Sequence, residues 1–229
     1  MTIKRFYTSS SSSHPKSSAP RYPLTHYPNA VLKHLLHRTP VMTEADKVTE
    51  ALDETEMIAP DGDVILIVGP DKARLRVHSH ALKMASKVFS AMLGPHFREG
   101  QGLNGFLPRE ISIPDDDPDA MLAICNVLHH CNNSLPNVIS PISIVRVAIA
   151  ADKYDCVVAL KYVMSHWLDF TGITNSLELV YLAAAAYLFN NARGFEEATR
   201  RLIFGHRGSY TSLAEDEYGA VVPWKAFSK

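Results

Sequence analysis

The sequence predicts an α+β fold in which a small three-stranded sheet is capped by helices and followed by a helical C-terminal extension. Three observations support this prediction. An apolar run and an alternating run lie close together near residue 70, and a shorter alternating run lies near residue 111. Between and after these runs, apolar residues recur at spacings of three and four, which is the pattern of a buried helix face.

The first two predicted strands form a hairpin. Residues 64–68 are continuously apolar and rich in β-branched side chains, which indicates a strand buried on both faces. Gly69 and Pro70 have the chemistry of a turn. Residues 74–78 then alternate between polar and apolar, so the second strand is predicted to be half exposed.

Two short helices are predicted between residues 79 and 93, because the apolar residues change there to helical spacing. Ser79 and Ser86 are of the residue type that caps helix N-termini. A loop that contains several glycines follows over residues 94–109. Residues 110–114 alternate again and predict the third strand, beside the hairpin.

The next helix is predicted to begin at Asp117 and Pro118, which suit a helix N-terminus. Its acidic start also invites interpretation as a calcium loop, but Ala120 and Asn126 stand where such a loop needs glycine and glutamate. At its end, residues 129–131 read His-His-Cys. Neighbouring helical side chains point about 100° apart, so they cannot converge on one ion, and no metal site is predicted. Four more helices are predicted, at residues 142–154, 157–170, 177–189 and 194–204.

The chain divides into five predicted parts. The first is a basic tail rich in Ser and Pro, which we expect to be disordered, with a mitochondrial transit peptide or a true translation start at Met42 as alternatives. An acidic linker or short helix comes second. The parts are residues 1–42 (tail), 43–59 (acidic linker or short helix), 60–170 (main domain), 171–206 (helical extension) and 207–229 (C-terminal tail).

Composition and motifs favour a binding protein over an enzyme. Residues 1–43 carry six Lys and Arg and no acid, whereas the other 186 residues carry 17 basic and 24 acidic side chains, a net charge of −7. An acidic body argues against nucleic-acid binding. No apolar run approaches the roughly 18 residues of a membrane span, so no membrane association is expected. No nucleotide-binding, zinc-protease or hydrolase motif is present, and neither a catalytic residue nor a cofactor is predicted.

The odd number of cysteines, three, without metal-ligand spacing, indicates a reducing compartment. This favours the cytoplasm, the nucleus or both.

The main domain, residues 60–170, resembles the BTB (POZ) domain. Its sequence is most similar in character to those of BTB proteins of filamentous fungi. The resemblance implies a BTB fold and protein partners, including homodimers or higher oligomers. A subset of the family binds the cullin scaffold of a ubiquitin ligase, so the resemblance also implies a cullin as a possible partner. The residues that carry the resemblance are Asp63, His78, Leu82, Ser86, Phe89, Met92 and the segment Ala151–Tyr154.

The resemblance also implies a partner-binding motif. Phe97 and Glu99 follow Leu93 by four and six residues, and they match the hydrophobic-x-Glu motif of cullin-binding members. Ser79 departs from the arginine that corepressor-binding members carry, so Asp63 is expected to cap the start of its strand instead. The predicted function is an interaction module that self-associates and acts as a substrate adaptor for a cullin-type ubiquitin ligase. The alternative is an oligomeric scaffold or transcription-regulatory BTB protein without a ligase.

Overall fold

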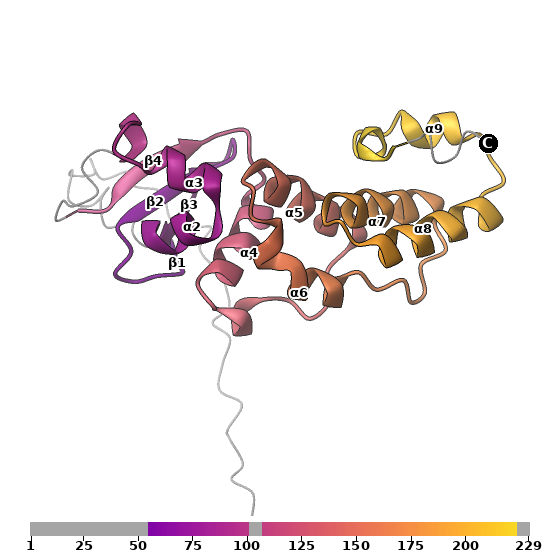
Figure 1. Ribbon diagram of the computed structural model, residues 1–229, viewed down its shortest axis with the longest axis horizontal. Helices are drawn as coiled ribbons and strands as arrows, with labels where there is room; N and C mark the ends of the chain where they lie inside the picture. The colour runs from indigo at the N-terminus through magenta and orange to yellow at the C-terminus, as the bar shows by residue number, and fades with distance from the viewer. Residues whose placement is uncertain (1–54, 101–106, 224–229) are drawn as a thin grey trace, which may run out of the picture. The chain divides into compact units, whose positions relative to one another are not determined.

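The computed structural model describes residues 55–100 and 107–223, and all of them belong to one compact unit. It confirms the α+β class, because a small sheet is followed by a body of helices (Figure 1). The predictions for residues 1–42, for most of residues 43–59 and for the last six residues lie outside the described ranges.

The sheet has four strands, one more than the sequence predicts. β2 pairs antiparallel with β3, as expected for the hairpin, and it pairs in parallel with β4 on its other side. The added strand, β1, pairs with β3 at an edge of the sheet, where a linker or short helix is predicted. In the order β1-β3-β2-β4, the strands are β1 (Thr55–Met57), β2 (Val64–Val68), β3 (Ala73–Val77) and β4 (Arg109–Ile113).

Eight α-helices are present in the described residues, and those of the C-terminal half follow the predicted order. α5 lies between α4 and α7, and α7 in turn packs against α8 (Figure 1). The helices are α2 (Ser79–Ala85), α3 (Lys87–Met92), α4 (Pro118–Leu128), α5 (Pro141–Lys153), α6 (Val157–Trp167), α7 (Ser176–Leu188), α8 (Ala192–Gly205) and α9 (Tyr210–Ala214).

The caps of the two short helices differ from each other. Ser86 caps α3 as predicted, since its hydroxyl accepts a hydrogen bond from the Phe89 N–H at 2.9 Å. The prediction that Ser79 caps α2 is wrong, because Ser79 is the first residue inside that helix. The Asp63 carboxylate accepts from the Ser79 N–H at 2.7 Å and from its hydroxyl at 2.6 Å. Asp63, which directly precedes β2, therefore holds the N-terminus of α2.

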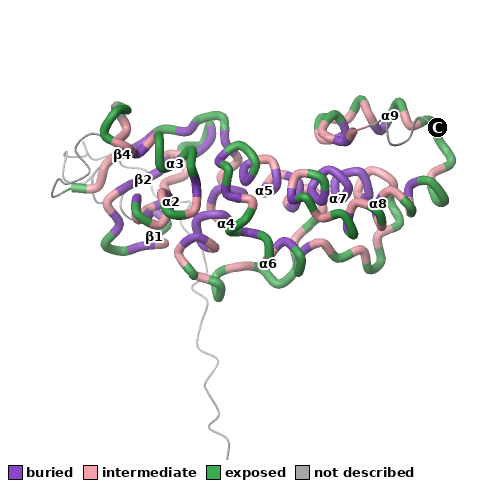
Figure 2. The backbone as a smooth tube through the Cα atoms, in the orientation of Figure 1, coloured by how far each residue is buried: buried purple, intermediate pink, exposed green. Residues whose placement is uncertain are grey.

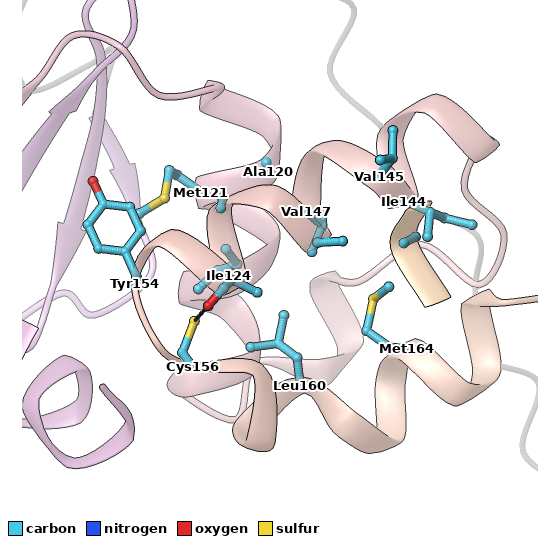
Figure 3. Close-up of a cluster of buried hydrophobic side chains, with 14 of the residues drawn as sticks. Ala120, Met121, Ile124, Ile144, Val145, Val147, Tyr154, Cys156, Leu160 and Met164 are labelled. Atoms are coloured by element: carbon cyan, nitrogen blue, oxygen red, sulfur yellow. Dashed lines mark hydrogen bonds between the residues drawn. The ribbon is translucent and has the colours of Figure 1, made fainter. Parts of the chain in front are cut away.

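The core runs from the sheet into the helices without interruption (Figure 2). Figure 3 shows its central part, where α4, α5 and α6 pack together through aliphatic and sulfur-containing side chains such as Ile124, Val147 and Leu160. α7 buries eight consecutive residues, Leu179–Ala186. A helix that is apolar on all sides is surrounded by other elements, and α7 contacts α5, α8 and α9. In residues 55–100 and 107–223, no helix is both long enough and apolar enough to cross a membrane.

Candidate partner-binding groove

An open, largely apolar groove lies between α3, β4 and the short 3-10 turn η1 (Arg98–Gly100). Its volume is about 530 Å³. It brings together the two residues predicted to bind a partner, Phe97 and Glu99, with apolar side chains of α3. The lining residues are Lys87, Val88, Ala91, Met92, Phe97, Glu99, Ile111 and Ser112.

Phe97 and Glu99 are both available for contact. The Phe97 side chain lines the groove yet stays 53% exposed, so it is not buried in its own domain. Backbone hydrogen bonds from the Phe97 N–H to the Gly94 carbonyl, and from the Gly100 N–H to the Phe97 carbonyl, fix the turn that presents it. Glu99 is half-buried and makes no ion pair with the described residues. An apolar anchor and a carboxylate without an ion pair in the described residues therefore lie two positions apart in the sequence and line the same groove.

A second open hollow lies on the other side of α3 and extends this apolar surface. It shares Lys87 and Ala91 with the groove, so the two are continuous across α3. Two of its lining side chains are strongly exposed apolar residues, Met84 at 75% and Val158 at 85%. Exposed apolar side chains that cluster in this way are typical of a protein-interaction surface.

The other residues that carry the family resemblance mostly support the groove from behind. Leu82 and Phe89 are fully buried. Phe89 stacks on Tyr154 with ring centroids 4.4 Å apart and ring planes 3° from parallel, and the Ser86 hydroxyl donates to the Tyr154 carbonyl. α3 is thereby fixed to the end of α5. Of these residues, only Met92 reaches the groove.

Asp63 and His78 belong to a polar network at the base of the sheet. Burial raises the pKa of the Asp63 carboxyl, but the hydrogen bonds from Ser79 outweigh it and leave this pKa below its ordinary value. The His78 N–H donates to His129 Nε2 at 2.9 Å, and His129 Nδ1 lies 2.7 Å from the Cys125 carbonyl oxygen. Because a carbonyl only accepts, Nδ1 carries the proton and His129 is a neutral imidazole here. Sequence reasoning placed His129 at a helix end and missed this contact, which joins residues 51 positions apart.

We expect the protein to lose stability as the pH falls below about 6.5, the ordinary pKa of histidine. Burial lowers the pKa of His129 in the folded state, and the neighbouring His78 and His130 lower it further, whereas the backbone hydrogen bonds with Cys125 and His78 offset this only in part. The unfolded chain therefore takes up the proton first, and the loss levels off once the pH is below the lowered pKa. Urea unfolding at several pH values between pH 8 and pH 5 measures this loss of stability. His129→Gln should show a shallower pH dependence over this range, and an unchanged dependence would contradict the prediction.

Two buried cysteines and Asp117 serve structural roles. Burial raises the pKa of both Cys125 and Cys156 to about 12, so both remain thiols at neutral pH. Asp117 caps α4 as predicted, since its carboxylate accepts from the Ala120 N–H at 2.8 Å. Within residues 55–100 and 107–223, no three His, Cys, Asp or Glu side chains are grouped so that they could hold a metal ion.

Comparisons with known proteins leave the chain without an assigned family. No family model matches it. A search of curated proteins also finds no similar sequence. The BTB resemblance therefore depends on the residues of this chain alone.

Proposed function

We propose that this protein is an interaction module of the BTB type that self-associates and uses the groove at α3 to bind the N-terminal region of a cullin. In this role it links other proteins to a ubiquitin ligase, in the cytoplasm, the nucleus or both. The observation that carries the proposal is the presence of Phe97 and Glu99 in one apolar groove with Val88 and Met92. The element order from β2 to α6 is also the order that the resemblance implies, and it supports the proposal.

The two groove residues suit different parts of a docking contact. A half-exposed aromatic ring that enters an apolar pocket of a partner is the kind of side chain that dominates binding energy. A carboxylate at the edge of the contact guides association and fixes the register of the two surfaces. We therefore expect Phe97 to control mainly the dissociation rate and Glu99 mainly the salt-dependent association rate.

Binding of the full chain to a purified cullin N-terminal region, measured by surface plasmon resonance, tests the proposal. We expect Phe97→Ala to weaken binding by about 30-fold, the size of an interface hot spot, and Glu99→Ala by about 3- to 10-fold. Matched controls are Tyr162→Ala on α6, an exposed aromatic at 86%, and Glu196→Ala on α8, both outside the groove. Equal binding by all four variants, or no binding by the wild type, would reject the adaptor role.

An oligomeric scaffold without a ligase is the second candidate. The exposed apolar side chains Ile203 and Phe204 at the end of α8, 54% and 83% exposed, favour contact with another protein chain and lie outside the groove. Light scattering on the full chain distinguishes the two roles when it is combined with the cullin measurement. A stable oligomer that does not bind cullin would favour the scaffold, and a strict monomer at tens of micromolar would reject self-association.

A further inference from the structure

A second cavity lies away from the groove, between α4, α5 and the segment that joins them. Its volume is about 370 Å³, which is within the range of small-molecule sites. It shares no lining residue with the groove at α3. Most of its wall is apolar, and the apolar lining residues are Ala120, Leu122, Ala123, Leu135, Pro136, Val138, Ile139, Val147 and Trp167.

One polar side chain in this wall is buried, and it makes no hydrogen bond with the described residues. Asn126 lines the cavity and is only 6% exposed. Its backbone carbonyl accepts from the Cys131 N–H at 2.8 Å, but its side-chain amide makes no hydrogen bond with any residue in the described ranges. The amide nitrogen and oxygen are not among the side-chain atoms of the described residues that are sealed from solvent without a partner, so they face the water of the cavity, which a ligand amide can replace. In an apolar cavity, such an amide is a group placed to recognise a ligand.

The charged residues of the cavity favour a neutral ligand over an anion. Asp117 and Asp119 belong to the start of α4, about two helical turns before Asn126, and Asp119 is exposed. Arg146 is the one cationic side chain in the lining, and it already contacts Asp117 at 3.4 Å and the Tyr218 hydroxyl at 3.0 Å. Two carboxylates against one engaged guanidinium leave the lining net negative, which repels an anionic ligand.

The other neutral polar groups of the wall are three serine hydroxyls and the Trp167 indole. Ser134 is exposed, and the hydroxyls of Ser140 and Ser143 lie 2.8 Å apart and bond to each other. The Trp167 Nε1–H is already used, since it donates to the Pro136 carbonyl at 2.9 Å.

We infer that the cavity binds a small, neutral aromatic carboxamide. The ring system would contact the apolar lining, the ligand carbonyl would accept from Asn126 Nδ2, and the ligand N–H would donate to Asn126 Oδ1. This site is independent of the proposed cullin contact.

Isothermal titration calorimetry of the full-length protein with naphthalene-2-carboxamide tests the inference. We expect saturable binding of one molecule per chain, and binding of naphthalene-2-carboxylate weaker by about tenfold or more. Asn126→Leu has nearly the same shape without the amide and should weaken carboxamide binding by about tenfold or more. The control Asn133→Leu changes an exposed residue outside the lining and should leave binding unchanged.

The stability of Asn126→Leu provides a readout that does not depend on the ligand. If the amide lacks an internal partner, an apolar side chain of similar shape should leave the melting temperature unchanged or raise it. A clear decrease would mean that Asn126 is satisfied within the protein, and it would overturn the inference. Failure of the wild type to bind the carboxamide saturably, or equal binding by wild type and Asn126→Leu, would overturn it as well.

Discussion

Replacing Phe89 with alanine is expected to lower the free energy of unfolding by about 3–5 kcal/mol, the usual cost of truncating a buried aromatic side chain. Phe89 is fully buried, and its ring lies parallel to that of Tyr154 at 4.4 Å. The substitution removes this stacking contact and leaves a cavity between α3 and the end of α5. Urea unfolding of wild type and variant at one pH measures the difference, provided that the denaturant dependence stays the same.

The matched control is Tyr162→Ala, which removes an aromatic ring from a site that is 86% exposed. Its stability should stay within about 0.5 kcal/mol of the wild type, as for other surface substitutions. Similar losses for the two variants would show that the packing of α3 against Tyr154 contributes little. The proposed cullin contact adds a second expectation. Because α3 forms one wall of the groove, a folded but loosened variant such as Phe89→Leu should bind the cullin region more weakly than the wild type.

Most of the fold could be predicted because periodicity determines it locally. The hairpin and the helices from α4 to α8 follow apolar spacing, and α5, α7 and α8 lie within two residues of their predicted bounds. α6 ends at Trp167, before the predicted Phe170. The Asp169 side chain accepts a hydrogen bond from the Thr171 N–H and forms a turn there. Such a turn competes with the helix, although the apolar pattern continues through it.

Features that depend on distant contacts could not be predicted in the same way. β1 is three residues long, and only its pairing with β3 makes it a strand. Asp63 caps a helix 16 residues away, which no local pattern indicates. Phe97 and Glu99 were found through a motif, but the walls that α3 and β4 add to their groove depend on tertiary packing.

The cavity at Asn126 was missed, although the sequence holds a signal for it. Asn126 follows Leu122 and Ala123 at helical spacing, on a face of α4 that is apolar between Asp119 and Asn126. An amide at a position with the spacing of a buried helix face indicates a polar contact there, because a buried polar group needs a protein partner or water.

Replacing Asp116 with alanine is expected to destabilise the protein by about 2–3 kcal/mol, less than for a fully buried ion pair because Lys153 is partly exposed. Asp116 is 7% exposed. Its two oxygens accept from Lys153 Nζ, both at 2.8 Å, and one of them also accepts from the Tyr154 hydroxyl at 2.7 Å. Burial, with the hydrogen bond to Asp116, raises the pKa of Tyr154 above its ordinary range, so the hydroxyl remains a donor. Alanine would leave this hydroxyl without its acceptor.

A comparison with Asp116→Asn separates the charge from the hydrogen bond. The asparagine oxygen can still accept from Tyr154 but cannot pair with the Lys153 ammonium, so we expect a smaller loss of about 1 kcal/mol. Urea unfolding measures both variants, and a loss below about 0.5 kcal/mol for Asp116→Ala would contradict the prediction.

Tyr154→Phe then tests whether Asp116 and Phe89 act on different parts of one side chain. Asp116 contacts the Tyr154 hydroxyl, whereas Phe89 contacts its ring. In the Tyr154→Phe background, Asp116→Ala should therefore cost clearly less than in the wild type, because no hydroxyl is left without an acceptor. Phe89→Ala should keep nearly its full cost, because the ring stack is still present to be lost. Equal coupling of both residues to the hydroxyl would mean that α3 is held by the polar network, and not by the stacked rings.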